Sequence, residues 1–227
     1  MTARPEPIVL SWSGGKDSSL ALAALRADPT VTVVALLTSV TSGYERISIH
    51  GVRRALLAEQ ARAVGLPLHE IVLAPACSND EYEAAFAAGL AEIRERVPSI
   101  RRIAFGDLFL EDVRGYRDRL VAALDWEAVY PLWRFDTTLL ARRFVRDGYA
   151  ARLVCVDTTL LEARFAGRSF DDTLLAELPS SVDPCGERGE FHTFVTDGPI
   201  FSRSVTYEVG EVVIRDARFA YCDLLPV

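Results

Sequence analysis

The chain has 227 residues, 50% of them hydrophobic, and its 25 basic and 32 acidic residues give a formal net charge of −7. A chain of this size and hydrophobicity buries a substantial core, which excludes an intrinsically disordered protein. The acidic balance argues against a general nucleic-acid or anionic-membrane binder, because such binding depends on an excess of lysine and arginine.

Apolar runs and helical patterns alternate along the first two thirds of the chain. The apolar runs are typical of strands buried on both faces of a parallel sheet, and the stretches between them space their apolar residues as amphipathic helices do. Strands are expected at 7–12, 31–37, 68–73, 102–106, 128–131 and 151–156, and helices at 18–26, 51–64, 79–96, 111–124 and 136–146. Repeated βα units with short connections predict a doubly wound, mainly parallel α/β fold.

The pattern changes after residue 157. A helix is expected at 170–178, followed by a loop rich in proline and glycine and by short alternating runs at 191–195, 204–209, 211–214 and 217–222. Such runs with turn residues between them are typical of antiparallel strands. We therefore predict two parts, an α/β domain over residues 1–157 and a smaller α+β region over residues 158–227.

The most informative motif lies at the first expected strand-to-helix junction. Its residues are Ser13, Gly14, Gly15, Lys16, Asp17, Ser18 and Ser19. The glycines let backbone N–H groups approach an anion, the helix start adds partial positive charge, and the Ser18 and Ser19 hydroxyls are further donors. The spacing matches neither a Walker A loop nor a dinucleotide fingerprint. The motif predicts a phosphate-binding loop, with a helix-capping turn that binds no ligand as the alternative.

Lys16 in this motif is the single lysine among the 25 basic residues, so every other one is an arginine. Lysine is a compact point charge, whereas arginine presents a planar fork of donors. A lone lysine inside a glycine-rich loop therefore indicates a charge that faces phosphate, although one lysine can also survive by chance.

The loop resembles those of the PP-loop ATP pyrophosphatases, members of the adenine nucleotide α-hydrolase superfamily. That resemblance implies cleavage of ATP between its α- and β-phosphates, with release of pyrophosphate and activation of a substrate oxygen as an adenylate. It implies that residues 13–19 hold ATP, that Lys16 neutralises developing charge and that Asp17 orients Mg²⁺ through the pyrophosphate.

Other nucleotide contacts are expected at the carboxyl ends of neighbouring strands, where open α/β sheets bind their ligands. Leu37 and Thr38, taken as the end of the second strand, are candidates for the adenine edge. Asp107 follows the strand at 102–106 and Asp157 follows that at 151–156. Each of these acids is a candidate for the same rim, with a helix cap as the alternative.

Further segments resemble the diphthine–ammonia ligase family over nearly the whole chain. The segments are Gly106-Asp107-Leu108, Pro131-Leu132-Trp133, Gly186-Glu187-Arg188-Gly189-Glu190-Phe191-His192-Thr193-Phe194-Val195 and Asp197-Gly198-Pro199-Ile200-Phe201. His50, ahead of the helix that carries Gln60, also fits. The resemblance implies that a carboxylate is adenylated by ATP and that ammonium then displaces AMP to give an amide.

The chemistry of that reaction suits three residues of the long segment. Glu187 and Glu190 flank a glycine turn, so one is expected to bind Mg²⁺ or a cationic substrate group and the other to accept a proton from ammonium. His192 is expected to orient a carboxylate or the α-phosphate, or else to be a buried, hydrogen-bonded strand residue. Residues 109–119 depart from the family's pattern, and they are expected near the acceptor rather than the phosphates.

Two other functions use the same loop. A tRNA-thiolating or lysidine-forming enzyme needs a basic surface, and the thiolases often need paired cysteines as well; the sequence shows neither. A nucleotide-binding regulator without turnover does not need Asp17, Glu187 and Glu190 together. We expect ATP, ammonium and a carboxylate-bearing protein or small molecule as partners, with nucleic acid disfavoured.

The sequence shows no features typical of a membrane segment or of a protein from an oxidising compartment. Its first residues lack the apolar segment of a signal peptide, and no stretch approaches the roughly 20 apolar residues of a membrane span. The four cysteines form no C-x-x-C pair. We expect a cytoplasmic protein with reduced, mostly buried thiols.

Overall fold

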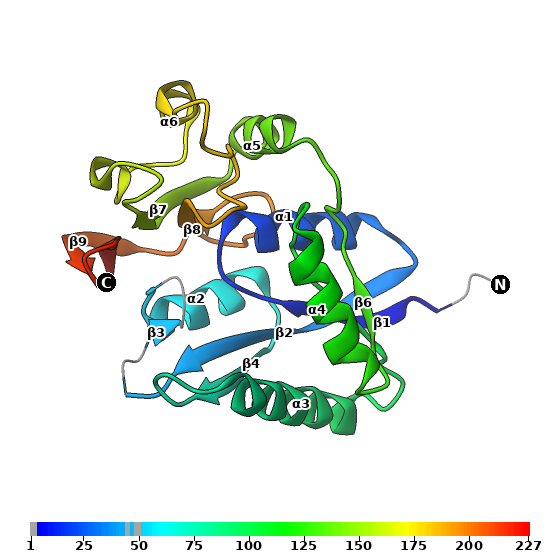
Figure 1. The fold of residues 1–227 in the computed structure, drawn as a ribbon. Coiled ribbons are helices and arrows are strands. Elements are labelled where there is room, and N and C mark those ends of the chain that lie inside the picture. The colour runs from blue at the N-terminus through cyan, green and yellow to red at the C-terminus, as the bar shows by residue number, and fades with distance from the viewer. Residues whose placement is uncertain (1–3, 44–45, 48–50) are drawn as a thin grey trace.

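A computed structural model describes residues 4–43, 46–47 and 51–227 of the chain, apart from the side chains of residues 46 and 47. Two sheets organise it, a mainly parallel sheet built by the first part of the chain and an antiparallel sheet built by the last part (Figure 1). The predicted fold class, a doubly wound α/β sheet with a small C-terminal α+β region, is confirmed.

The parallel sheet is centred on β1. Its path runs β3-β2-β1-β5-β6, and β4 pairs with β2. All its pairings are parallel except that of β3 with β2. The strands are β1 (Glu6–Ser11), β2 (Val31–Thr41), β3 (Arg46–Ile47), β4 (Leu68–Leu73), β5 (Arg102–Ala104) and β6 (Glu127–Val129).

Helices cover both faces of this sheet because the central strand is apolar on both sides. Ile8 and Leu10 of β1 belong to one buried cluster, and Val9 between them belongs to the other. The first cluster includes side chains of α1 (Lys16–Ala27) and α2 (Arg54–Val64), the second those of α3 (Asn79–Arg96) and α4 (Glu111–Ala122). The uninterrupted apolar runs seen in the sequence are therefore strands buried on both faces.

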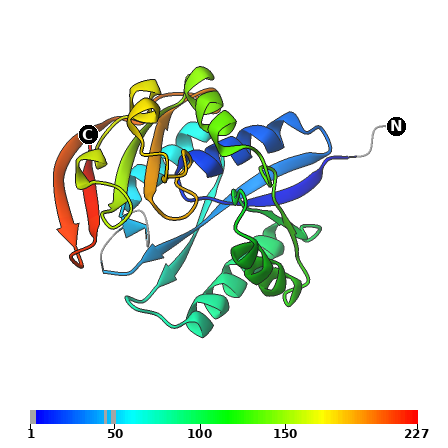
Figure 2. The same ribbon diagram turned by 45° about the horizontal axis from the view of Figure 1, so that its top comes forward.

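The antiparallel sheet has the order β8-β7-β10-β9. Its strands are β7 (Ala150–Asp157), β8 (Phe191–Asp197), β9 (Tyr207–Arg215) and β10 (Phe219–Pro226). Its buried side chains join the first cluster, as do those of α5 (Thr137–Arg146), η1 (Ala163–Phe165) and α6 (Asp172–Glu177). Figure 2 shows this sheet beside the parallel sheet, with β9 and β10 at the outer edge.

Two details of the expected strand pattern are wrong. The segment 151–156 was expected in the parallel sheet, but as β7 it pairs antiparallel with β8 and β10. A run buried on both faces has the same composition in either sheet, and its partners follow it in the chain, so local pattern does not reveal the pairing. The runs at 204–209 and 211–214 form one strand, β9. The division of the chain after residue 157 stays a prediction.

Asp157, at the end of β7, holds the second sheet together. Its carboxylate accepts hydrogen bonds from the Arg218 guanidinium, at 2.9 Å from Nε, and from the Thr159 hydroxyl at 2.6 Å. The hydrogen bonds from Arg218 lower the pKa of Asp157 to about 2. Asp157 therefore does not cap a helix: its carboxylate is tied to Arg218 and to the turn at Thr159, and its place at the nucleotide rim stays a prediction.

Two expectations about the surroundings of the protein can be compared with the structure. Within the described residues, no helix has the length and apolar character needed to cross a membrane. Cys155, Cys185 and Cys222 are buried and Cys77 is partly buried, which confirms that the thiols are mostly buried.

Candidate functional site

The glycine-rich segment forms the connection between β1 and α1, as predicted. Gly14 has a φ of +77°, in the left-handed region that favours glycine. A Cβ atom at Gly14 would lie 2.7 Å from Gln60 Oε1 and 2.9 Å from Leu57 Cδ1. The first glycine of the motif is therefore required both by backbone conformation and by close packing against α2.

Gln60 fixes the position of this loop. Its side chain is fully buried, and Nε2 donates hydrogen bonds to the Gly14 carbonyl at 2.9 Å and to the Val195 carbonyl. Its Oε1 accepts a hydrogen bond from Trp12 Nε1 at 3.1 Å. The Val195 N–H also donates to the Gly14 carbonyl, at 2.9 Å. One amide side chain thus ties the loop to α2 and to β8 of the second sheet.

Hydroxyl groups organise the other side of the loop. The Lys16 N–H, at the start of α1, donates to Thr193 Oγ1 of β8 at 3.0 Å. The Ser18 and Ser19 hydroxyls donate to the Gly15 carbonyl at 2.9 and 3.0 Å, and the Gly15 N–H donates to Ser13 Oγ at 3.2 Å. Both serine hydroxyls predicted to face phosphate therefore point their protons at the loop backbone in this arrangement.

The ammonium group of Lys16 lies at the centre of the site. The side chain is 2% exposed, and Nζ donates to the Asp17 carboxylate at 2.8 Å and to the Cys185 carbonyl. The rings of Phe191 and Phe170 lie 5.8 and 6.0 Å from Nζ. Burial favours the neutral amine, but the charge and hydrogen bonds of Asp17, together with the nearby Cys185 and Glu187, outweigh it, so the pKa of Lys16 lies above its ordinary value and the group stays charged.

Two buried carboxylates hold the loop that contacts Lys16. Asp183 accepts hydrogen bonds from the Cys185 N–H at 2.9 Å and from Thr137 Oγ1 of α5 at 2.7 Å. Glu190 accepts from the Asp183 N–H at 2.9 Å and from the Arg188 N–H at 3.0 Å. Glu190, predicted as catalytic, is therefore turned toward the backbone of its own loop, and it shares that work with Asp183, which the sequence did not single out.

Glu187 is turned the other way, toward the end of β5. Its Oε1 accepts hydrogen bonds from the Leu108 N–H at 2.7 Å and the Phe109 N–H at 3.4 Å. Burial raises the pKa of Glu187 to about 7, although those two N–H groups favour the charged form. The negative charge of Asp17 raises it further. This carboxyl group therefore titrates near neutral pH beside the lysine and its loop.

Asp107 lies on the same rim. Gly106, directly before it, packs against the first turn of α1, where an added Cβ would lie 3.0 Å from the Asp17 carbonyl carbon. The Asp107 carboxylate forms an ion pair with Arg117 of α4, with Nε 2.8 Å from Oδ2. The structure thus brings Asp107, Glu187 and the loop together, with one carboxylate already paired to an arginine.

Leu37 and Thr38 lie beside the loop, but not at a strand end as expected. β2 continues to Thr41, so both residues lie within the strand. Leu37 is the register partner of Ser11, the last residue of β1, and its carbonyl accepts the Trp12 N–H at 2.7 Å. The strand that ends there is β1, and β2 extends past it. The apolar run of β2 stops at Leu37, but the strand continues through the polar residues Thr38, Ser39 and Thr41, so the end of the apolar run did not mark the end of the strand.

The two histidines predicted near the site have different outcomes. His192 lies in β8, and burial together with the charge of Lys16 lowers its pKa to about 4, so its imidazole is neutral at physiological pH. His50 lies outside the described residues.

The carboxylates of the site do not form a metal cage by themselves. Among the residues that the structure describes, no group of three or more His, Cys, Asp or Glu side chains is arranged to hold a metal ion. Mg²⁺ normally needs only one or two protein carboxylates, because substrate phosphates and water complete its shell. Asp17, with both oxygens directed at Lys16 Nζ, is a hard-oxygen donor of that kind at the start of α1.

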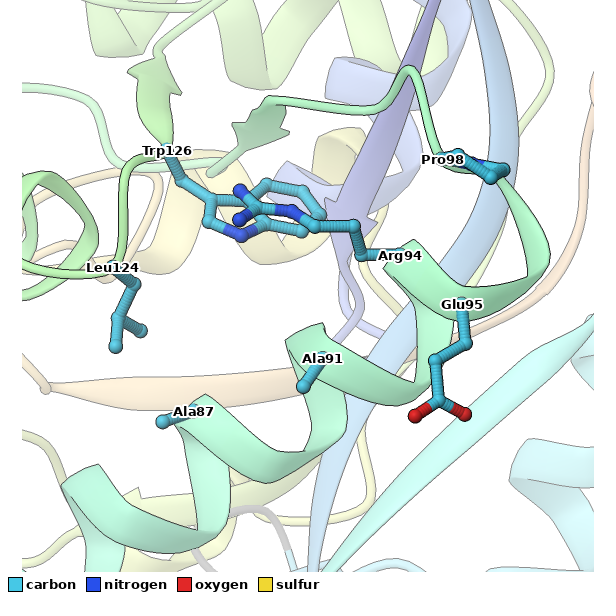
Figure 3. A pocket seen from close by; sticks show the side chains of 7 residues that line it. All are labelled: Ala87, Ala91, Arg94, Glu95, Pro98, Leu124 and Trp126. Atoms are coloured by element: carbon cyan, nitrogen blue, oxygen red, sulfur yellow. The ribbon is translucent and has the colours of Figure 1, made fainter.

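A separate hollow of about 530 Å³ lies between α3 and the segment 124–126. Arg94 stacks over the ring of Trp126 at 4.9 Å, and Ala87 and Ala91 line the helix side (Figure 3). None of the predicted site residues lines this hollow, which therefore does not compete with the loop as the candidate site.

Two protein-family models together match most of this chain. The family model of the diphthamide synthase N-terminal domain matches residues 7–125, and that of the C-terminal domain matches residues 136–222. A Homo sapiens protein named diphthine–ammonia ligase is 25% identical, over 78% of this chain and 67% of its own length. The Mus musculus protein of the same name is 25% identical, over 90% of this chain and 84% of its own length. A Danio rerio protein of that name is 27% identical, over 70% of this chain and 68% of its own length.

Replacing Gln60 with leucine tests whether this amide fixes the loop. The Gln60→Leu variant keeps the volume but leaves the Val195 carbonyl and Trp12 Nε1 without this partner. We expect the free energy of unfolding, measured by urea denaturation, to fall by about 2–4 kcal/mol. The control is Glu59→Leu, on the exposed side of the same helix, which should cost far less because exposed ion pairs contribute little to stability. Equal stability of the two variants would contradict the role given to Gln60.

Replacing Glu187 with glutamine tests the raised pKa of that carboxyl group. The folded pKa of about 7 lies above the ordinary value of 4.5, so the folded state binds the proton more tightly than the unfolded state. The contribution of Glu187 to the free energy of unfolding is fully present below pH 4.5, the ordinary pKa, and is lost as the pH rises through about 7. We therefore expect Glu187→Gln to gain melting temperature relative to the parent as pH rises, whereas the exposed control Glu95→Gln should not. Melting curves that stay parallel for Glu187→Gln and the parent would rule this out.

Proposed function

Because the chain belongs to the diphthamide synthase family, whose relatives are named diphthine–ammonia ligase, we propose that it is an ATP-dependent ligase that joins ammonia to a carboxyl group. The observation that carries the proposal is the convergence of the β1–α1 loop, its buried lysine and the loop 183–190 at one end of the parallel sheet. Open α/β sheets bind their ligands at this end.

In the first half-reaction, an oxygen of the acceptor carboxylate attacks the α-phosphorus of ATP. The bond from the α-phosphorus to the bridging oxygen breaks, and pyrophosphate leaves with that electron pair. Residues 13–19 hold the departing phosphates through backbone N–H groups and the helix start. Lys16 supplies a positive charge that burial makes strong, since few water molecules screen it.

Asp17 is the residue we assign to hold Mg²⁺ in the loaded enzyme, together with the phosphates. Bound there, Mg²⁺ would supply charge neutralisation at the phosphate oxygens. Asp17 also sets the position of Lys16 Nζ, and the Cys185 carbonyl on the opposite loop shares that ammonium. The loop 183–190, held by Asp183 and Glu190, thus positions the lysine from the acceptor side.

In the second half-reaction, ammonia attacks the carbonyl carbon of the acyl adenylate. The new C–N bond forms as the bond to the AMP oxygen breaks, and the nitrogen loses protons on its way from ammonium to amide. Glu187 is the proton acceptor that we assign, because its pKa of about 7 makes it a base at neutral pH. His192, neutral and partly buried, is assigned to orient the acceptor or the α-phosphate by hydrogen bonding.

The acceptor, a protein or a small molecule that carries a carboxylate, is placed beside Glu187 and the segment 107–109. Residues 158–227 form the acceptor side of the site under this proposal, and residues 1–157 form the nucleotide side. Leu37 and Thr38, next to the end of β1, lie within the nucleotide side, where we assign them to the adenine edge.

The product pattern tests the proposal. With ATP, ammonium and the correct carboxylate, we expect AMP and pyrophosphate in equal amounts, because the bond broken lies between the α- and β-phosphates. Ion-exchange chromatography of the nucleotides with a coupled pyrophosphate assay measures both. Formation of ADP and phosphate would refute the proposal.

Exchange of the lysine for arginine tests the need for a compact charge. Lys16→Arg keeps the charge, but a planar guanidinium does not fit between Asp17, the Cys185 carbonyl and two phenylalanine rings. We expect turnover to fall by about 10²–10³-fold. The control is Arg203→Lys, an exposed basic exchange, which should keep parental turnover. Near-parental turnover in a folded Lys16→Arg protein would show that the lysine is incidental.

A further inference from the structure

The β9 strand is a long edge strand of the antiparallel sheet. It spans nine residues, Tyr207–Arg215, and β10 is its one neighbour among the strands that the structure describes. Val209, Val212, Val213 and Ile214 are 40–59% exposed. A long apolar edge strand is a template for pairing with another chain, and proteins that must avoid such pairing place lysine, proline or a bulge there. β9 contains neither lysine nor proline, but it bulges at Gly210 and Glu211, which together lie opposite Asp223, so its regular stretch is 211–215.

The exposed side chains lie on both faces of β9. Val212 and Ile214 are register partners of the buried residues Cys222 and Ala220 on β10, so they share the face of the sheet that packs on the core. Val213 is the partner of Tyr221, on the opposite face. The edge strand therefore extends past the core, and an occupant that adds a strand would cover apolar side chains on both faces.

We propose that this occupant is a second copy of the chain, with the two β9 strands pairing antiparallel about a two-fold axis at Val213. In that register Val213 lies opposite its own copy and Val212 lies opposite the partner's Ile214. Glu211 lies opposite the partner's Arg215, and the symmetry gives this pair twice. Neither Glu211 nor Arg215 forms an ion pair with another described residue, so both charges are available for such a contact.

The charge pattern selects this register over its neighbours. Opposite residues of an antiparallel pair must point to the same face, so the two-fold axis has to pass through a residue. An axis at Glu211 or at Arg215 would place like charges opposite each other, which destabilises the pair. An axis at Val212 or Ile214 leaves Glu211 without an opposite charge. Only the axis at Val213 joins the opposite charges across the strands.

The dimer would leave the candidate site open. β8, which holds the phosphate loop, lies at the other edge of the antiparallel sheet, with β7 and β10 between it and β9. Figure 2 shows β9 at the outer edge of the molecule. The proposal therefore stands independently of the reaction assigned to the chain, and turnover per chain should not depend on dimer formation.

The size of the contact sets its strength. With the axis at Val213, residues 211–215 of the two β9 strands lie opposite each other, and residues 207–210 lie beyond the end of the partner's strand. So short a contact buries less than the roughly 1,600 Å² of a standard interface, and we expect a dissociation constant on the order of 10 µM. Sedimentation velocity of the full chain from about 1 to about 200 µM would measure it. We expect the sedimentation coefficient to rise from that of a monomer to that of a dimer across this range.

Charge exchange tests the register. Glu211→Arg and Arg215→Glu each place two like-charged pairs across the strands, so each should raise the dissociation constant about tenfold. The double variant Glu211→Arg/Arg215→Glu restores opposite charges and should return to within about threefold of the parent. Weakening in both single variants without recovery in the double variant would overturn this register.

A lysine on the edge tests the surface itself. Ile214→Lys should abolish the dimer in the measured range, because the ammonium would be buried against the partner's Val212. The matched control is Val72→Lys, at a valine of similar exposure on β4 of the other sheet, which should leave the dimer unchanged. A parent chain that stays monomeric throughout the range, or a dimer that persists in Ile214→Lys, would overturn the proposal.

Discussion

The site depends on the hydrogen bonds made to one carbonyl group, that of Gly14. Gln60 Nε2 and the Val195 N–H both donate to it at 2.9 Å, so the loop after β1 is held by α2 on one side and β8 on the other. Because these bonds fix the Gly14 carbonyl, they also fix the orientation of the backbone that follows it, including the N–H groups in the first turn of α1. The same bonds join the two sheets, so the loop after β1 and the proposed acceptor side are positioned together.

Electrostatics in the site are unusual because its charges are buried. Lys16 keeps its proton because Asp17 and the other nearby groups together outweigh the cost of burial. The pKa of Glu187 lies near 7 because the two N–H groups that it accepts only partly offset its desolvation. His192 is neutral in the same field. A fixed cation beside an adjustable carboxyl group suits a reaction that first stabilises a phosphate leaving group and then removes protons from ammonium.

Local pattern was enough for most of the fold and for part of the site. The alternation of apolar runs and helical spacing gave the parallel sheet, and the glycine loop fell where a strand meets a helix. The pairing of β7 and the roles of Gln60 and Asp183 were not predictable, since they depend on partners far away along the chain. For Gln60 one signal was present: it lies in the apolar stripe of α2 with Leu56 and Val64, where a polar side chain needs a buried partner.

The central claim is that a carboxylate is adenylated before ammonia attacks. Exchange of labelled pyrophosphate into ATP tests this most directly, because exchange requires a reversible first step that needs no ammonium. The account predicts that label enters ATP when the acceptor carboxylate is present, ammonium is absent and Lys16 is intact. Amide formation by a chain that shows no carboxylate-dependent exchange, and produces ADP, would contradict it.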